Sequence, residues 1–397
     1  MTTAERVHSS GPGADPRLPG IEAHPHARAL LVPAIAPGGS PSHAYLFHGP
    51  AGTGKRSIAR SFAAALLADD PSQTAAIAER ISHRSHPDLT WVTPSGASEM
   101  LVADIEEPVV AAAARTPFEA TRRVFVIEAV DTMTEEAANR MLKTLEEPPA
   151  FVHLLLLTDR REDVLETIAS RCQAVRFDPL PPALVAERLE VAGTEAATAS
   201  ASARLALGDA RLAERLAGAE GRALRAGAEG FVRAAVDGRT EARPWTALLD
   251  AAKASGERAG VSSEEQLAAR LELLPAKERK RAEREALVDR RRVERRERTR
   301  TLQEGLRLAE LWLRDLLCIE AGAPELIYAV DRVGELESAD TRALALARVS
   351  ADPEYLLTAI ELVTDTRLSL AQNVSEELAL EALAYRLAIG PRLGSSP

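Results

Sequence analysis

The stretch Gly49-Pro50-Ala51-Gly52-Thr53-Gly54-Lys55-Arg56-Ser57 follows a short apolar run and precedes a helical pattern. Glycines let consecutive backbone amides turn toward phosphate oxygens, and the start of a helix adds partial positive charge. A lysine in the place of Lys55 reaches the outer phosphates of a nucleotide. The stretch predicts a phosphate-binding loop for ATP or ADP. A glycine-rich turn that only joins a strand to a helix is the less favoured alternative.

The position after the lysine departs from the phosphate-loop pattern. A serine or threonine at this position binds magnesium through its hydroxyl group, whereas this chain carries Arg56. Ser57 lies one residue later, about 100° further round a helix, so it is a poor substitute. We therefore expect the loop to bind nucleotide with weak magnesium binding or none.

A second acidic motif follows the apolar run at residues 124–127, which ends in Glu128-Ala129-Val130-Asp131. In phosphate-loop ATPases one carboxylate at this point helps to hold magnesium, and in one class the next residue polarises the attacking water. Glu128 takes the first slot and Ala129 the second, and alanine cannot accept a proton. We expect little ATP hydrolysis, because loss of a positioned base slows a reaction by about 10²–10⁴. The alternative is that Glu128 or Asp131 compensates.

The surrounding sequence predicts an α/β domain followed by all-α regions. Short apolar runs alternate with helical stretches, which is typical of the buried strands of a mostly parallel sheet. The runs are 45–47, 89–92, 124–127, 154–157 and 174–177, and the helical stretches include 55–68, 105–114 and 135–145. Prolines at 179, 181 and 182 end this pattern. Ala/Leu-rich helices follow, with an apolar stripe at Leu306, Ala309, Leu313, Leu316 and Leu317.

Four parts of the chain are expected from these changes in pattern. Residues 1–20 are rich in Gly, Pro and Ser and predict a flexible tail. The other parts are a nucleotide-binding domain at 21–179, a small helical domain at 180–240 and a larger helical domain at 241–397.

Composition excludes several classes of protein. The 397 residues carry a net charge of −10, so the molecule as a whole does not coat nucleic acid. The two cysteines, Cys172 and Cys318, form neither a disulfide framework nor a cysteine-rich metal site. No apolar run approaches the roughly 18 residues of a membrane span, and the first residues lack a secretion signal. We expect a cytoplasmic protein with no membrane partner and no metal site.

One segment, residues 277–300, carries twelve Lys/Arg against six Asp/Glu. Acidic residues are interleaved and aromatic residues for base stacking are absent. A solvated helix with internal ion pairs is therefore favoured over a surface that follows DNA.

Two further stretches carry a family resemblance. Residues 139–149, Asn-Arg-Met-Leu-Lys-Thr-Leu-Glu-Glu-Pro-Pro, and residues 167–172, Thr-Ile-Ala-Ser-Arg-Cys, closely resemble the signatures of the gamma, tau and delta-prime clamp-loader subunits of bacterial DNA polymerase III. Residues 43–50 and 372–374 are similar to the same family, and the resemblance runs from about residue 21 to 390.

The resemblance implies an AAA+ domain, a helical lid and a C-terminal helical collar that joins five subunits. It implies gamma/tau and delta as partners in a hetero-pentamer, together with a sliding clamp and, through the complex, primer-template DNA. The implied role is to assist clamp opening and loading in DNA replication. DNA polymerase activity belongs to the holoenzyme, so the chain alone is not expected to be a catalyst.

Within the family, the delta-prime type fits best. Gamma and tau have an Asp-Glu pair where this chain has Glu128-Ala129, and they carry a four-cysteine zinc module. Residues 68–87 contain no cysteine, so we expect no zinc, although many delta-prime chains do have the module. Three alternatives stay open: an ATP-hydrolysing gamma/tau-like subunit, an autonomous AAA+ motor, and a scaffold that never binds nucleotide.

The resemblance also assigns roles to residues. Arg171, in Ser-Arg-Cys, is the arginine that reaches in trans to the ATP of a neighbouring subunit; the alternative is a structural pair with a nearby carboxylate. Thr158 is either a phosphate sensor or a turn residue, and Cys172 is a small buried residue more than a nucleophile. The expected nucleotide-binding residues are Gly49, Pro50, Ala51, Gly52, Thr53, Gly54, Lys55, Arg56, Ser57, Glu128, Thr158 and, in the lid, Arg211.

Overall fold

The computed structural model describes residues 15–83, 85–94, 99–273, 276–334, 353–370 and 374–389, with the backbone alone at 266, 269–270, 272–273 and 276–289. The chain divides into two compact units. The first unit comprises residues 1–181 with 208–210, and the second comprises 182–207 with 211–397. The division falls at the prolines that end the α/β pattern, and the predicted lid and collar both fall in the second unit, apart from residues 180–181 and 208–210.

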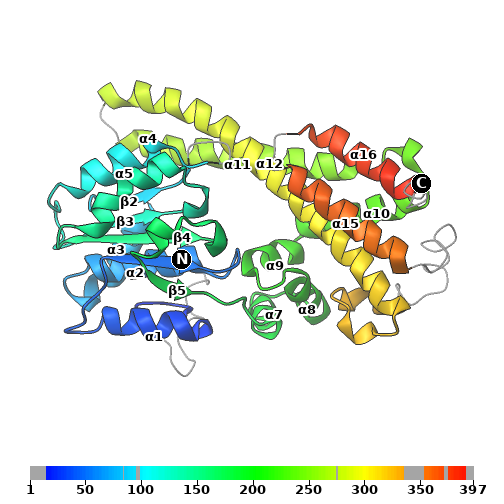
Figure 1. The fold of residues 1–397 in the computed structure, drawn as a ribbon, viewed down its shortest axis with the longest axis horizontal. Coiled ribbons are helices and arrows are strands. Elements are labelled where there is room, and N and C mark those ends of the chain that lie inside the picture. The colour runs from blue at the N-terminus through cyan, green and yellow to red at the C-terminus, as the bar shows by residue number, and fades with distance from the viewer. Residues whose placement is uncertain are drawn as a thin grey trace. The chain divides into compact units, whose positions relative to one another are not determined.

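The first unit is built on a parallel sheet of five strands in the order β2-β3-β4-β1-β5 (Figure 1). The strands are β1 (Ala44–His48), β2 (Leu89–Val92), β3 (Arg123–Ile127), β4 (Val152–Thr158) and β5 (Gln173–Arg176). Every apolar run singled out in the sequence lies on one of these strands, except that Phe177 follows the end of β5. The predicted fold class, an α/β domain with a parallel sheet followed by helices, is confirmed.

Alternation along the strands divides the core of this unit into two layers. Leu46, Phe125 and Leu156 point to one side of the sheet, and their chain neighbours Phe47 and Val126 point to the other. Successive side chains of a strand face opposite ways, so each strand contributes to both layers. Both faces of the sheet therefore require a cover of helices.

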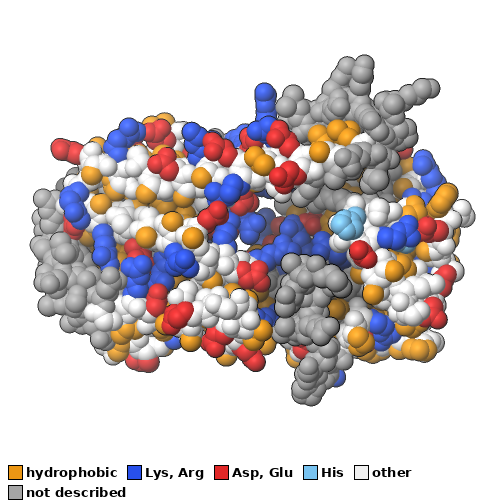
Figure 2. Space-filling model, turned by 180° about the vertical axis from the view of Figure 1, so that it is seen from behind, with side chains coloured by type: hydrophobic (Ala, Val, Ile, Leu, Met, Phe, Trp, Pro, Cys, Tyr) orange, Lys and Arg blue, Asp and Glu red, His pale blue; other side chains and the backbone are white. Residues whose placement is uncertain are grey.

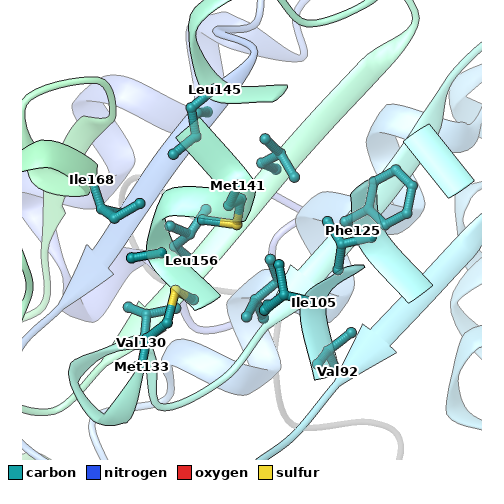
Figure 3. Packing of buried hydrophobic residues seen from close by; sticks show 14 of the residues in the cluster. Val92, Ile105, Phe125, Val130, Met133, Met141, Leu145, Leu156 and Ile168 are labelled. Atoms are coloured by element: carbon teal, nitrogen blue, oxygen red, sulfur yellow. The ribbon is translucent and has the colours of Figure 1, made fainter. Parts of the chain in front are cut away.

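Helices cover both faces (Figure 1). Figure 3 shows the first layer, where Ile105 of α4 and Met141 and Leu145 of α5 pack on Phe125 and Leu156. Side chains of α1, α2 and α3 on the opposite face form the second layer. The helices of the first unit are α1 (Pro25–Ala34), α2 (Lys55–Leu67), α3 (Thr74–Ser82), α4 (Val102–Ile105), α5 (Glu135–Glu146) and α6 (Glu166–Ala169), with short 3-10 turns at Ile21–Ala23, Pro71–Gln73, Val130–Thr132 and Arg161–Asp163.

Local sequence explains where two of these helices begin and change. Thr134 starts α5, because its hydroxyl oxygen accepts a hydrogen bond from the amide of Ala137 (3.3 Å). The single helix expected at 105–114 is instead α4 followed by a π-helix at Glu106–Ala111. Pro108 lies inside this π-helix; it has no N–H to donate, which disfavours continuation of a regular α-helix.

The structure differs from the predicted flexible tail in the last residues of that segment. Residues 15–20 are folded: Leu18 is fully buried, and Arg17 donates to both carboxylate oxygens of Asp15. Leu18 contributes to the layer that also contains Ile21 and Phe47. Its apolar side chain was overlooked because glycine and proline dominate the flanking sequence. Residues 1–14, and Gln372 and Asn373 of the family resemblance, lie outside the described residues.

The second unit has helices and no strand among its described residues. Its helices are α7 (Pro182–Val191), α8 (Ala196–Leu205), α9 (Ala210–Ala217, whose first residue belongs to the first unit), α10 (Ala219–Val236), α11 (Thr246–Leu273), α12 (Ala276–Glu320), α15 (Pro353–Ser369) and α16 (Glu376–Ile389), with 3-10 turns at Thr240–Ala242, Pro324–Leu326 and Val330–Arg332. The long helix α12 packs against α10, α11 and α15. Leu306, Ala309 and Leu313 on it are fully buried, so the predicted apolar stripe is confirmed.

The charged segment 277–300 lies on α12, and its side chains are described from Arg290 onward. Arg290 pairs with Glu294 at 2.7 Å and Arg300 with Glu304 at 3.0 Å, each one turn apart. Cationic and acidic side chains are interspersed over the face shown in Figure 2. For these residues the structure has the intrahelical ion pairs that the solvated-helix interpretation requires. None of the described helices is long and apolar enough to cross a bilayer.

Two phenylalanines of the first unit test the packing of the core. Phe125 is fully buried, whereas Phe118 is 85% exposed. We expect Phe125→Ala to lower the free energy of unfolding by about 3–5 kcal/mol, because it removes a buried ring and leaves a cavity. Phe118→Ala is the matched control and should change it by less than about 0.5 kcal/mol. Chemical denaturation of the two variants measures both values, and equal losses would contradict the described packing.

Candidate functional site

The predicted site residues of the first unit gather at one edge of the sheet. The loop 49–54 follows β1, Glu128 follows β3, and Thr158 ends β4, which lies between β1 and β3. Because these strands are parallel, their carboxyl ends meet at the same edge, where α/β proteins bind ligands. The order of the strands therefore brings together three segments that lie far apart in the sequence.

Glycines give the loop its close turns. Gly49 has φ +139°, and a Cβ atom there would lie 2.0 Å from the carbonyl oxygen of Phe177. Gly52 has φ +70°, and a Cβ atom there would lie 1.8 Å from a carboxylate oxygen of Asp209. Only glycine fits such positions without strain. Residues 49–54 thus form the compact loop that the sequence predicted, and α2 begins directly after it.

Lys55 is buried inside this loop. Its Nζ atom donates to the carbonyl oxygens of Gly49 and Pro50, both at 2.6 Å, and lies 2.7 Å from the Asp159 carboxylate. Burial lowers the pKa of the Lys55 ammonium, while Asp159 acts in the opposite direction. An ammonium has three N–H donors, so these contacts use them all. A phosphate that reaches Lys55 has to take the place of Asp159.

Arg56 and Glu128 meet across the same edge. The Arg56 guanidinium forms an ion pair with Glu128 Oε2, and Glu128 Oε1 accepts a hydrogen bond of 2.7 Å from Trp91 Nε1. Magnesium requires oxygen ligands in octahedral geometry, but a guanidinium holds the carboxylate here and Ser57 is exposed on α2. These residues do not fit a magnesium ion. Within the described ranges, no cluster of three or more His, Cys, Asp or Glu residues could hold a metal.

The other candidates for a general base are also engaged or missing. Ala129 follows Glu128 in the left-handed conformation, with φ +52°. Asp131 accepts hydrogen bonds from the Thr158 hydroxyl at 2.8 Å and from the Arg160 guanidinium at 3.1 Å. The hydroxyl of Thr158 is therefore turned toward Asp131, and its role as a phosphate sensor stays a prediction.

Arg171 lies at the surface of the first unit, just after α6. Its side chain is 35% exposed and its guanidinium contacts Glu146 through Nη2 (2.5 Å) and Nε (2.9 Å). A further bond joins Nη1 to the carbonyl oxygen of Thr167 (2.9 Å). The carboxylate partner considered from the sequence is thus present, and the action of Arg171 in trans stays a prediction.

Two other predicted residues have different surroundings. Burial raises the pKa of the Cys172 thiol to about 12, so it is almost entirely protonated at neutral pH and unsuited to nucleophilic attack. Arg211 is exposed on α9 in the second unit. Its proposed contact with phosphate stays a prediction.

Four residues that shape this unit were not predicted from the sequence: Trp91, Glu146, Asp159 and Asp209. Asp159 carried a usable signal, since it follows β4 directly and charged residues at the carboxyl ends of parallel strands tend to line sites. Asp209 and Trp91 carried none, because their contacts with Gly52 and Glu128 depend on segments far apart in the sequence.

Comparison with known proteins identifies relatives of the first unit. Residues 25–181 match the protein family described as "DNA polymerase III, delta subunit". A stretch of 154 residues is 36% identical to the DNA polymerase III subunit delta' of Bacillus subtilis (strain 168), covering 37% of this chain and 46% of that protein. The delta' subunit of Pseudomonas aeruginosa is 36% identical over 147 residues, 36% of this chain and 44% of its own length.

These alignments span less than half of either relative. The solved structure of a gamma subunit-related protein from Thermotoga maritima covers 87% of this chain and 94% of its own, with 17% identity and a TM-score of 0.38. The resemblance to clamp-loader subunits of the delta-prime type, predicted from the residues, is confirmed over the region that the sequence alignments cover.

The contact between Lys55 and Asp159 predicts a competition. We expect Asp159→Asn to raise the affinity for ATP about two- to fivefold, because the anion that phosphate must displace is gone and exposed ion pairs are worth about 0.2–1 kcal/mol. Asp163→Asn is the matched control, since Asp163 pairs with Arg160 and not with the loop. Titration with fluorescently labelled ATP measures both, and unchanged affinity in Asp159→Asn would contradict the competition.

Proposed function

We propose that this chain, whose first unit resembles the delta-prime subunits of bacterial DNA polymerase III, is a clamp-loader subunit that acts in DNA replication in the cytoplasm. It assists the opening of a sliding clamp and its placement on primer-template DNA. Its partners are gamma/tau and delta subunits in a hetero-pentamer, joined through the C-terminal helices. The family match at residues 25–181 and the five-stranded parallel sheet support this proposal.

The observation that carries the proposal is the state of the hydrolysis residues. Glu128 has both oxygens engaged by Arg56 and Trp91, and Ala129 has no group that accepts a proton. Asp131, the remaining candidate, is held by Thr158 and Arg160. A base must reach the proton of the attacking water directly or through one further water molecule. The chain is therefore a weak ATPase at most, and it serves the loader through what it offers to its neighbours.

Arg171 is the residue that this chain offers to a neighbouring subunit. A guanidinium stabilises the charge that develops on a transferred phosphoryl group, and such an arginine contributes about 10³–10⁵ in rate where it has been removed. Its partial exposure and its place outside the core leave it accessible to another subunit. The bond from Nη1 to the carbonyl oxygen of Thr167 orients the guanidinium even when phosphate replaces Glu146, which lowers the entropy lost on binding.

Loss of this arginine should affect only the site of the neighbour. We expect Arg171→Ala to abolish ATP turnover at the one site that Arg171 faces. The ATPase rate of the reconstituted loader should fall by the fraction that this site contributes to the total. Arg176→Ala is the matched control, since Arg176 is an exposed arginine in an ion pair with Asp178. Phosphate release by loaders assembled with each variant measures the effect. A normal rate with Arg171→Ala would overturn the assignment in trans.

The isolated chain should hydrolyse ATP poorly. We expect its turnover to lie about 10²–10⁴ below that of an isolated gamma/tau-type subunit, because no described residue serves as the base. Phosphate release with and without primer-template DNA measures this. Brisk turnover stimulated by DNA would instead favour an autonomous motor, and brisk turnover without DNA a gamma/tau-like subunit.

A further inference from the structure

The pair formed by Arg56 and Glu128 stands where a phosphate loop ordinarily holds its metal. Arg56 occupies the position whose hydroxyl binds magnesium, and Glu128 occupies the position of the carboxylate that helps to hold it. In this chain the two side chains bind each other. Cation and carboxylate are thus both present at the metal position, but the cation belongs to the chain.

Burial explains why Glu128 keeps this partner. Its side chain is only 8% exposed, and a buried carboxylate needs a counter-charge and filled hydrogen bonds. The guanidinium provides the charge, and the Trp91 indole N–H fills the other oxygen. A magnesium ion would have to displace the guanidinium and would find no hydroxyl ligand on residue 56. Repulsion between the ion and the displaced guanidinium further disfavours the exchange.

The same guanidinium remains open to phosphate. Half of the Arg56 side chain is exposed (52%), and a guanidinium has five N–H donors, of which the contact with Glu128 involves one terminal nitrogen. Arg56 directly follows Lys55 in the first turn of α2, where the backbone amides of a helix also attract anions. Guanidinium groups bind phosphate oxygens in paired, charge-assisted hydrogen bonds.

We propose that Arg56, held by Glu128, takes the place of magnesium in this loop, so that the chain binds nucleoside di- or triphosphates without a divalent cation. The inference rests on the assignment of residues 49–57 as a nucleotide loop. Lys55 and Arg56 then neutralise the phosphate charge. In other phosphate loops a lysine and a metal ion share this role. Because no metal is held, the loop is suited to keeping a nucleotide bound and unsuited to cleaving it.

Equilibrium binding by the full chain tests this. Fluorescently labelled ATP and ADP are titrated in magnesium and, separately, in EDTA, and anisotropy gives the dissociation constant. For the unaltered chain we expect the two constants to agree within about twofold. In Arg56→Thr, which restores the hydroxyl ligand and removes the guanidinium, we expect binding in EDTA to weaken at least about tenfold and magnesium to recover it, since one lost charged contact is worth about that factor.

Two controls separate this effect from general damage. Arg60→Thr makes the same substitution one turn later on α2, where the guanidinium lies over the Trp91 ring, and its constants should stay independent of magnesium. Ser57→Ala removes the neighbouring hydroxyl, and its constants should be equally independent. Circular dichroism verifies that every variant is folded before titration.

The outcomes are distinct. Binding by the unaltered chain that requires magnesium, or no binding in either condition, overturns the inference. Equal dissociation constants for Arg56→Thr in magnesium and in EDTA also overturn it. None of these results contradicts the proposed function. Neither assembly with the other loader subunits nor the effect of Arg171→Ala depends on a nucleotide in this loop.

Discussion

The parallel pairing of β4 between β1 and β3 is the constraint on which the site depends. His48 lies opposite Thr158, and Ile127 lies opposite Leu156, so the three strands end at nearly the same level. Residues placed just after these strands therefore lie at the same end of the sheet. Both faces of the sheet are buried, so a slip by one residue would move the side chains of a strand into the opposite layer of the core, where they would not fit the packing described above.

Charge balance then decides what the assembled edge can do. It gathers the cations of Lys55 and Arg56 with the carboxylates of Glu128 and Asp159, and each cation pairs with one carboxylate. Separated charges at partly buried positions are costly, whereas paired charges are tolerated. The site is thus neutralised by its own side chains. On the proposed assignment, Asp159 occupies the place of a phosphate and Arg56 that of a metal, so a nucleotide that binds exchanges with these side chains.

The sequence predicted most of the fold because the dominant signals are local. Five apolar runs, the glycine-rich loop and the proline cluster are each recognisable within a few residues. The runs lie on the strands apart from Phe177, the loop follows β1, and the prolines lie at the boundary between the two units. The departures from the ATPase motifs at Arg56 and Ala129 were equally easy to recognise, since a motif fixes which residue type belongs at each position. The contacts of Trp91 and Asp209 could not be predicted, because they join residues that only the folded chain brings together. The π-helix at Glu106–Ala111 was missed because Pro108 acts on a hydrogen-bond pattern that periodicity alone does not reveal.

Two arginines of the first unit illustrate how similar contacts serve different ends. Arg56 and Arg171 each pair with a single glutamate, but Glu128 is nearly buried while Glu146 is about half exposed. The first pair is hard to break, because separation would leave a buried carboxylate without a counter-charge. The second is exposed to solvent and worth far less, so Arg171 can exchange Glu146 for the phosphates of another subunit at little cost. A conformational change requires a ligand that favours one state over another. A loop that does not hydrolyse its nucleotide offers no such change of ligand, so on the proposed function this chain keeps one conformation while its neighbours turn over.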